Sequence, residues 1–272
     1  MNLGVLNLPT SPVVMGVLNL TPNSFYDGNA YTSIEAAVAR GEEMLREGAA
    51  LIDVVAESTR PGADKMSVQA ELDCAIPVIE LLAKRVAIPV SINTSNPEVM
   101  QAAVQAGAKI INDIRALTKP GAMNMVAKLG VPVCLMHMQN DPVTMQLTSS
   151  YQDVVSEVYQ YLKHRIEACV AEGIDAKKII IDPGFGFGKN LPHNLKLLRS
   201  LQVFKNLQHP ILVGLSNKSM IGQILDVGVE RRVYGSIAAA VFAVSKGADI
   251  IRAHDVQATV DAIKVAIVIA AP

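Results

Sequence analysis

Short apolar runs recur along the chain and alternate with longer segments of mixed polarity. Most of these runs are continuously apolar and rich in β-branched residues, which is typical of strands buried on both faces of a parallel sheet. Eight runs are predicted strands: Val13–Leu18, Ala50–Val55, Ile88–Ile92, Lys109–Asn112, Pro132–Leu135, Lys178–Ile181, Pro210–Val213 and Asp249–Ile251.

The longer segments carry apolar residues three and four positions apart, which predicts amphipathic helices. The clearest are Ser33–Glu47, Val68–Arg85, Pro97–Ala106, Tyr151–Glu172 and Arg231–Lys246. Three joints between a helix and the next strand have similar sequences, EGAA, AGAK and KGAD. We expect the glycine of each joint to end its helix in the left-handed conformation: Gly48, Gly107 and Gly247.

Strands and helices in this alternation form either an open doubly wound sheet or a closed barrel. An open sheet is expected to carry a GxGxxG turn after its first strand, and this sequence has none there. The length of 272 residues suits one barrel, and no linker-like or low-complexity stretch divides the chain. The pattern therefore predicts an α/β fold, a (β/α)₈ TIM barrel, as a single domain over residues 1–272.

The net charge of −1 and the sequence pI near 6.5 indicate no excess of basic residues. Nucleic acid and anionic membranes attract basic surfaces, so neither is expected as the main partner. The three cysteines, Cys74, Cys134 and Cys169, are far apart and lack zinc-ligand spacing. The chain also lacks a signal-like leader and an apolar run of membrane-spanning length, so the cytoplasm is the expected location.

Polar side chains follow most of the predicted strands, at the barrel end where active sites of this architecture lie. Any single one of them can equally cap a helix or satisfy loop backbone. Their occurrence after eight strands together favours a functional rim. The candidates are Asn19, Asp53, Glu57, Asn93, Asn112, Asp113, His137, Asp182, Lys218, Arg252 and His254.

Basic residues gather after the last two predicted strands. Lys218, Arg252 and His254 can supply positive charge, and Ser219 can begin a helix whose free amides face an anion. Barrels of this type commonly bind phosphate at this position. A pair of ordinary solvated basic residues is the alternative, but the combination favours an anionic substrate group.

The segment after the sixth predicted strand, DPGFGFGK, is rich in glycine but does not match the Walker pattern. Its glycines allow tight backbone turns, and Phe185 or Phe187 can offer a flat face to a ring or pack in the core. Asp182, Asn112 and Lys218 together suit a planar heterocycle with an amide–amidine edge. The reason is that a carboxylate accepts parallel N–H bonds, an amide both donates and accepts, and an ammonium donates.

Seven segments, in order and spread over nearly the whole chain, resemble dihydropteroate synthase. They are MGVLNLTPNSF (15–25), IDVVAESTRPGA (52–63), IINDI (110–114), LMHMQ (135–139), DPGFGFGK (182–189), GLSNKSMIG (214–222) and IRAHDV (251–256). The resemblance implies a cytoplasmic, homodimeric folate-biosynthesis enzyme and a target of sulfonamides. Its reaction would be the Mg²⁺-dependent condensation of 6-hydroxymethyl-7,8-dihydropterin diphosphate with p-aminobenzoate.

The resemblance also implies roles for individual residues. Asn93, Asn112, Asp182, Phe187 and Lys218 would surround the pterin. The diphosphate would be held by Thr59, Arg60, Arg252 and His254, with Asn19 at the Mg²⁺ ion. Ser219 would receive the aminobenzoate carboxylate, and Asp27 and Arg60 would belong to loops that close over the departing pyrophosphate.

Four departures from the family pattern cluster at the expected active rim. Asn93 stands where the family usually has Asp, and Asn217 stands where it usually has Arg. Asn23 replaces a common Asp, and Val55-Ala56 replaces a pair of glycines. We expect these changes to affect the rate and the response to sulfonamides more than the fold.

Two other readings of the sequence stay open. The chain can be a pterin-binding paralogue with little or no turnover, which the neutral residues Asn93 and Asn217 make credible. It can also be a pterin-dependent methyltransferase barrel, although such an enzyme has no need for a diphosphate site. Product formation separates an active synthase from both.

Overall fold

The computed structural model describes residues 12–20, 30–57, 66–139 and 150–271. Within these residues eight parallel strands form one sheet in the order β6-β5-β4-β3-β2-β1-β8-β7. The strands are β1 (Val13–Asn19), β2 (Leu51–Val55), β3 (Val90–Asn93), β4 (Ile110–Asp113), β5 (Val133–Met136), β6 (Ile179–Asp182), β7 (Leu212–Gly214) and β8 (Ile250–Ala253).

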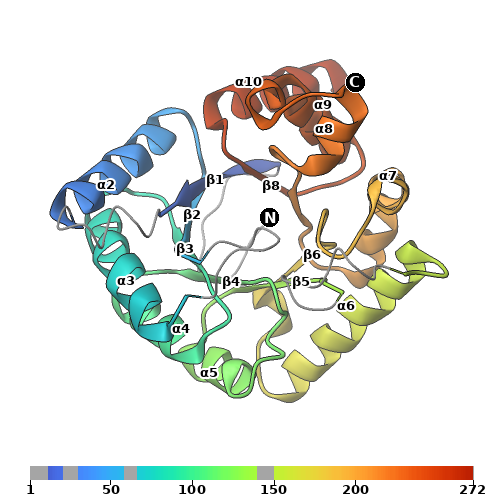
Figure 1. The fold of residues 1–272 in the computed structure, drawn as a ribbon. Helices are drawn as coiled ribbons and strands as arrows, with labels where there is room; N and C mark the ends of the chain where they lie inside the picture. The colour runs from blue at the N-terminus through green and yellow to red at the C-terminus, as the bar shows by residue number, and fades with distance from the viewer. Residues whose placement is uncertain (1–11, 21–29, 58–65, 140–149, 272) are drawn as a thin grey trace.

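The two ends of the sheet meet, so the sheet closes into a barrel. Ile181 of β6 forms a parallel bridge with Ile211, directly before β7, and its N–H donates to the carbonyl of Pro210 at 2.9 Å. Helices surround the closed sheet, as Figure 1 shows. They are α2 (Ala30–Arg46), α3 (Val68–Arg85), α4 (Pro97–Gln105), α5 (Ala122–Leu129), α6 (Val154–Ala171), α7 (Leu191–Arg199), α8 (Ser219–Leu225), α9 (Val233–Ser245) and α10 (Val256–Ala270). The predicted (β/α)₈ barrel is confirmed.

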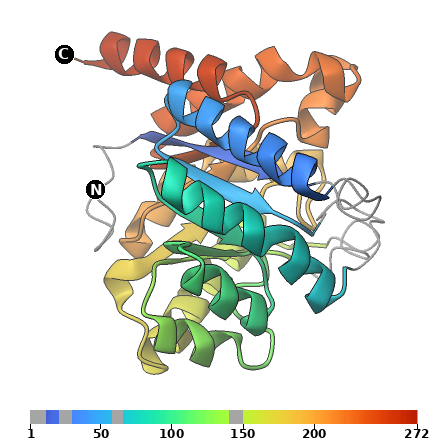
Figure 2. The same cartoon turned by 90° about the vertical axis from the view of Figure 1, so that its left-hand side faces the viewer.

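Side chains of each strand alternate between the barrel interior and the surrounding helices. The outward set, such as Val14, Ile52 and Ile111, belongs to the large core between sheet and helices. Figure 2 shows α2 and α3 crossing the outside of the sheet, and residues of both helices belong to this core. The inward apolar set forms a separate cluster, which we call the barrel floor: Val13, Met15, Leu51, Ile110, Cys134, Ile180, Leu212 and Ile250.

Polar side chains occupy the next inward positions above the barrel floor. Two residues after Leu51 comes Asp53, two after Ile110 comes Asn112, and two after Ile180 comes Asp182. The strand period of two therefore places these residues over an apolar base. The residues between them, such as Ile181, point to the helices instead.

Most strands extend one residue further toward the active rim than the sequence predicted. Asn93, Asp113 and Asp182 are the last residues of β3, β4 and β6, although an apolar pattern alone ended these strands earlier. Helix α3 has the predicted bounds, while α6 begins at Val154 because the side chain of Asp153 caps it. The expected left-handed glycines are confirmed, with φ of 95°, 116° and 96° at Gly48, Gly107 and Gly247.

Among the described residues, no helix combines the length and apolar character that a membrane-crossing segment needs.

Gly184, in the loop after β6, is expected to tolerate no side chain. Its φ is +70°, and an added Cβ would overlap the carbonyl oxygen of His137 at the end of β5. Gly173 is the matched control, because its φ is +98° and a Cβ there meets nothing within 4 Å. We expect Gly173→Ala to cost only the backbone strain, about 1–2 kcal/mol of unfolding free energy, and Gly184→Ala to cost more.

Denaturant unfolding of both variants measures the difference between these costs. Equal losses of stability would show that the contact with His137 is relieved without cost and would contradict the prediction.

Candidate active site

A buried carboxylate at the middle of β2 joins polar side chains from three other strands. Asp53 Oδ2 accepts from Asn93 Nδ2 at 3.3 Å, from Asn112 Nδ2 at 3.0 Å and from Arg252 Nε at 2.8 Å. Asp53 Oδ1 accepts from Ser91 Oγ at 2.8 Å. The structure thus brings three of the predicted site residues together around one acid, to which the sequence analysis gave no role of its own.

Asp182 completes this layer from the end of β6. Its Oδ1 accepts from the N–H of Gly184 at 2.7 Å, which turns the following loop back over the barrel. Burial raises the pKa of the Asp182 carboxyl to about 6, and the Gly184 hydrogen bond and the charges of Lys218, Lys189 and Arg252 oppose that rise. Asp182 is therefore a desolvated carboxylate among cations, suited to accept hydrogen bonds from a ligand.

Lys218 lies immediately before helix α8. Its Nζ is 4.2 Å from the ring centroid of Phe187, a cation–π arrangement. Burial and, after it, the charge of Arg252 lower the pKa of Lys218 to about 8, and the charge of Asp182 counteracts both. The amine therefore holds its proton at neutral pH, but less firmly than an exposed lysine does.

The two phenylalanines of the loop after β6 have different surroundings. Phe185 is 1% exposed and packs into the core between sheet and helices. Phe187 forms a small apolar cluster at the barrel mouth with Ile114 and Met136, against which Met138 packs. Phe187 is thus the aromatic side chain placed next to the polar layer, where it can face a ring. Phe185 is the one that packs in the core.

Lys189 holds this loop in place from inside. The ammonium donates to the carbonyls of Gly184 at 2.9 Å and Phe187 at 3.0 Å, and it lies 2.8 Å from His137 Nδ1. Burial lowers the pKa of Lys189 to about 7 and lowers that of His137 as well. Both residues therefore belong to the support of the loop, because their polar atoms are used by neighbouring groups of the chain.

The loops after β7 and β8 are tied to each other. Ser216 Oγ lies 2.9 Å from His254 Nδ1 and accepts from the N–H of His254 at 3.2 Å. Asn217 has a φ of +59°, a conformation that Asn adopts more readily than most residues. Its carbonyl accepts from Arg232 at 3.0 Å, and Ser219 begins α8 directly beyond.

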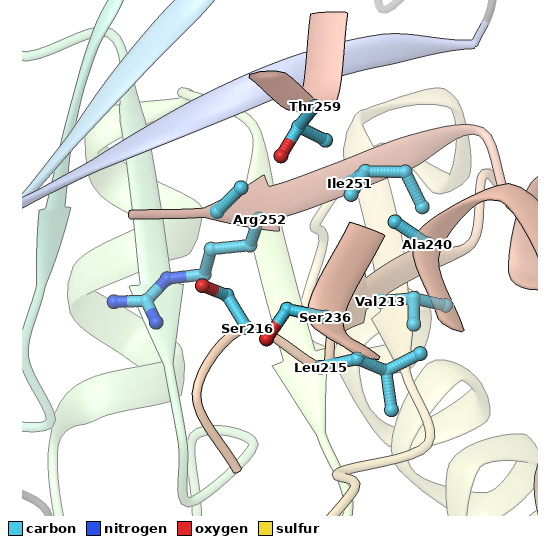
Figure 3. A pocket seen from close by; sticks show the side chains of 9 residues that line it. Val213, Leu215, Ser216, Ser236, Ala240, Ile251, Arg252 and Thr259 are labelled. Carbon is cyan, nitrogen blue, oxygen red and sulfur yellow. The ribbon is translucent and has the colours of Figure 1, made fainter. Parts of the chain in front are cut away.

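A small hollow lies behind this pair of loops, between β7, β8, α9 and α10. Figure 3 shows the residues around it, with the guanidinium of Arg252 pointing away from Ile251 and Ala240. Its lining is Val213, Leu215, Ser216, Ser236, Ala240, Ile251, Arg252, Ala253 and Thr259. Most of these residues belong to the helix side of the sheet, and Arg252 is the residue that the hollow shares with the inward polar layer.

The predicted site residues fall into three groups. Asn93, Asn112, Asp182 and Arg252 share the inward polar layer, and Lys218 and Phe187 adjoin it. His254 lies directly after β8, Ser219 is the first residue of α8, and Asn19 is exposed at the end of β1. Asp27, Thr59 and Arg60, like Asn23, lie outside the described residues.

Sequence reasoning missed the importance of Asp53 and Lys189. A charged residue in the middle of the apolar run Leu51–Val55 was the available signal for Asp53, since an acid inside a buried strand needs partners. Lys189 ends the segment DPGFGFGK, and nothing in the sequence indicated its contacts with His137 and with the carbonyls of Gly184 and Phe187.

Comparison with known proteins agrees with the motifs. Residues 15–254 match the family model of the pterin binding enzyme family. Dihydropteroate synthase of Escherichia coli strain K12 is 51% identical over 254 residues, which cover 93% of this chain and 90% of that protein.

Two solved structures of Xanthomonas albilineans dihydropteroate synthase are also similar. One, with 4-aminobenzoic acid, has 49% identity, a TM-score of 0.90 and coverage of 96% of this chain and 94% of that one. The other, in complex with 7,8-dihydropteroate, has 46% identity, a TM-score of 0.86 and coverage of 96% and 95%. The chain belongs to the pterin-binding enzyme family and, within it, to the dihydropteroate synthases.

Proposed function

We propose that this barrel condenses 6-hydroxymethyl-7,8-dihydropterin diphosphate with p-aminobenzoate to give 7,8-dihydropteroate and pyrophosphate. The observation that carries the proposal is the inward polar layer of Asn93, Asn112, Asp182 and Arg252 above an apolar base. Similarity to synthases whose structures contain the aminobenzoate or the product supports the same assignment.

In this proposal the pterin lies at the inward polar layer, above the barrel floor, and is held at its polar edge. The Asp182 carboxylate accepts two N–H bonds from the amino and ring nitrogens, and Lys218 donates to the ring carbonyl. Asn112 and Asn93 supply further amide contacts, and Phe187 lines one side. These partners match the donors and acceptors of a flat heterocycle, and the apolar side chains around them exclude water.

The diphosphate would leave toward the cations of the last two strands. Arg252 and His254 neutralise charge on the leaving oxygens, together with Thr59 and Arg60 outside the described residues, and Asp27 belongs to the adjoining loop. The C–O bond at the pterin methylene breaks with its electrons going to pyrophosphate. The aromatic amine then forms the new C–N bond, and Ser219 receives its carboxylate.

The attacking amine also loses a proton, which the departing pyrophosphate or water can accept, so no strong base is needed. A neutral aromatic amine is already nucleophilic, so the chain's task is to stabilise the leaving group and the positive charge at the methylene. Keeping water out protects the electrophilic carbon from hydrolysis. The apolar cluster of Ile114, Met136 and Phe187 at the mouth provides part of this shelter.

A Mg²⁺ requirement fits the residues present if substrate phosphates supply most ligands. Among the described residues no group of three His, Cys, Asp or Glu side chains is placed to hold a metal ion. The exposed amide of Asn19 at the end of β1 offers one neutral oxygen, which suits a Mg²⁺ ion bound mainly to diphosphate. Bound there, the ion would neutralise charge on the leaving pyrophosphate.

Product formation from the two substrates with Mg²⁺ tests the proposal directly. We expect the parent chain to turn over and to stop when EDTA removes the metal. Asn93→Asp is the informative variant, because a family-like carboxylate there would be worth about 2–4 kcal/mol if this chain lacked the charge. We expect a change in kcat/KM of less than about tenfold, or about 1.4 kcal/mol, because Asp53 already supplies a carboxylate 3.3 Å away.

An inactive parent that gains turnover through Asn93→Asp would instead identify a pterin-binding paralogue that has lost its catalytic charge. A parent and a variant that both form no dihydropteroate would leave the methyltransferase alternative.

We expect two buried ionisable groups to limit activity, one as the pH falls and the other as the pH rises. Asp182, with a pKa of about 6, gains a proton as the pH falls through that value and stops accepting from the pterin. Lys218, with a pKa of about 8, loses its proton as the pH rises through that value. We therefore expect kcat/KM for the dihydropterin diphosphate to be bell-shaped, with its maximum between the two values. Initial rates across this range measure the profile, and a flat one would show that neither ionisation controls pterin binding.

We also propose that two copies of the chain associate through α8, α9 and α10, which lie side by side in Figure 1. Large apolar side chains are exposed there, among them Tyr234 at 82%, Phe242 at 41% and Val268 at 75%. Adjacent exposed apolar residues of this kind mark association surfaces. We propose that a second copy of this chain covers this surface, as the resemblance to dihydropteroate synthase implies.

Sedimentation velocity should give twice the chain mass of 29.0 kDa. Phe242→Glu should shift the protein toward monomer, because it puts a charge into an apolar contact. Val170→Glu is the control, since Val170 is 45% exposed on the distant helix α6. Equal behaviour of the two variants would contradict the proposed surface.

A further inference from the structure

The carboxylate of Asp53 has an unusual number of partners for a fully buried group. It is 0% exposed, yet its two oxygens accept four hydrogen bonds from side chains of β3, β4 and β8. Three of the donors, Asn93, Asn112 and Arg252, are residues that the proposed function places against the substrate. Asp53 itself lies among them, at the level directly above the barrel floor, and is the fully buried member of the group.

A carboxylate that accepts from an amide fixes which end of that amide faces it. Asn93 and Asn112 both turn their Nδ2 atoms toward the oxygens of Asp53, at 3.3 and 3.0 Å, because a carboxylate offers only acceptors. Each amide oxygen is then the acceptor that the residue can present to a ligand. A planar heterocycle with several N–H groups can donate to these two amide oxygens. A heterocycle that carries acceptors at the same positions cannot.

Asp53 also fixes the plane of the Arg252 guanidinium. The Nε atom donates to Asp53 Oδ2 at 2.8 Å, so this contact with Asp53 does not occupy the two terminal nitrogens. The Arg252 side chain is 21% exposed while Asp53 is fully buried, so the pair joins the inside of the barrel to its mouth. Because a guanidinium is rigid and planar, one fixed N–H sets the direction of the others.

The same carboxylate accounts for the charge of this cluster. Asn93 is neutral and donates to Asp53, so it adds no negative charge next to Arg252. Asp182 lies across the barrel on β6, where its N–H donor and cation neighbours differ from those of Asp53. Asp53 is therefore the acid that balances Arg252 on the β2–β3 side of the site.

We propose that Asp53 is a positioning residue that orients the amides of Asn93 and Asn112 and the guanidinium of Arg252 for the pterin. The inference rests on the proposed function in one respect, that the ligand of these groups is a pterin. It assigns no contact with the substrate to Asp53. It assigns the orientation of the groups that contact the pterin to a buried neighbour that does not contact it.

The test is calorimetric binding of 6-hydroxymethylpterin, which lacks the diphosphate and cannot react. Asp53→Asn keeps the volume but introduces a donor, so both amides are free to turn and Arg252 loses its ionic partner. We expect the Kd to rise at least fivefold, with the midpoint of thermal unfolding close to that of the parent. In turnover assays we expect KM for the dihydropterin diphosphate to rise more than kcat falls.

Ser91→Ala is the matched control, because Ser91 donates to the other oxygen, Oδ1, at 2.8 Å and touches none of the three oriented groups through it. We expect this variant to bind the pterin within about twofold of the parent. A loss as large as that of Asp53→Asn would show that general packing at this level is responsible and would overturn the proposal.

The double variant Asp53→Asn/Asn93→Asp keeps one carboxylate and the same volume but moves the charge to β3, so it guards against a folding defect of the single variant. We expect pterin binding to stay at least fivefold weaker than in the parent. A smaller loss in either variant overturns the proposal, since the place of the carboxylate would then not matter. Failure of the parent to form dihydropteroate would reject the proposed function while leaving this binding comparison intact.

Discussion

Closure of a parallel sheet imposes one constraint on every strand of this protein, that alternate side chains point into a confined space. The bridge between Ile181 and Ile211 completes the ring, and after that no inward side chain can escape to solvent sideways. The lower inward positions are filled by the barrel floor. The next positions hold Asp53, Asn112, Asp182 and Arg252. Asp53 accepts from Asn112 and Arg252, while Asp182 accepts from the N–H of Gly184.

Desolvation in this confined layer gives the site its chemical character. Asp182 and Lys218 are perturbed in opposite senses by the same cause, since burial disfavours the charged form of an acid and of a base alike. Lys189 is perturbed in the same way, but its ammonium is used by the carbonyls of Gly184 and Phe187. The difference between a residue of the site and a residue of its support is therefore whether its polar atoms are left for a ligand.

The sequence predicted the barrel well because hydrophobic period and glycine position are local signals. Helix α3 was placed to the residue, and the left-handed glycines were found from three short joints. Strand ends such as Asn93 and Asp182 were placed too early, because the hydrogen-bonded ladder continues through polar residues that an apolar pattern excludes. The motif resemblance supplied the site residues, whereas the separation of Phe185 from Phe187 needed the folded loop.

What the sequence could not give was the set of contacts that barrel closure creates. The partners of Asp53 are separated from it by 38, 40, 59 and 199 positions, so no local pattern connects them. The contacts of Lys189 with His137 have the same origin, since β5 and the loop after β6 meet only when the strands are side by side.

The barrel floor has a consequence for the order of events during a catalytic cycle. Eight apolar side chains fill the interior below the polar layer, so substrates and products enter and leave through the opposite end of the barrel. A molecule seated directly on this base must arrive before any partner that binds nearer the entrance, and it can depart only after that partner has cleared the way. The ligand that binds deeper in the barrel therefore binds first and leaves last. This compulsory order follows from the packing of residues that never touch the reacting atoms.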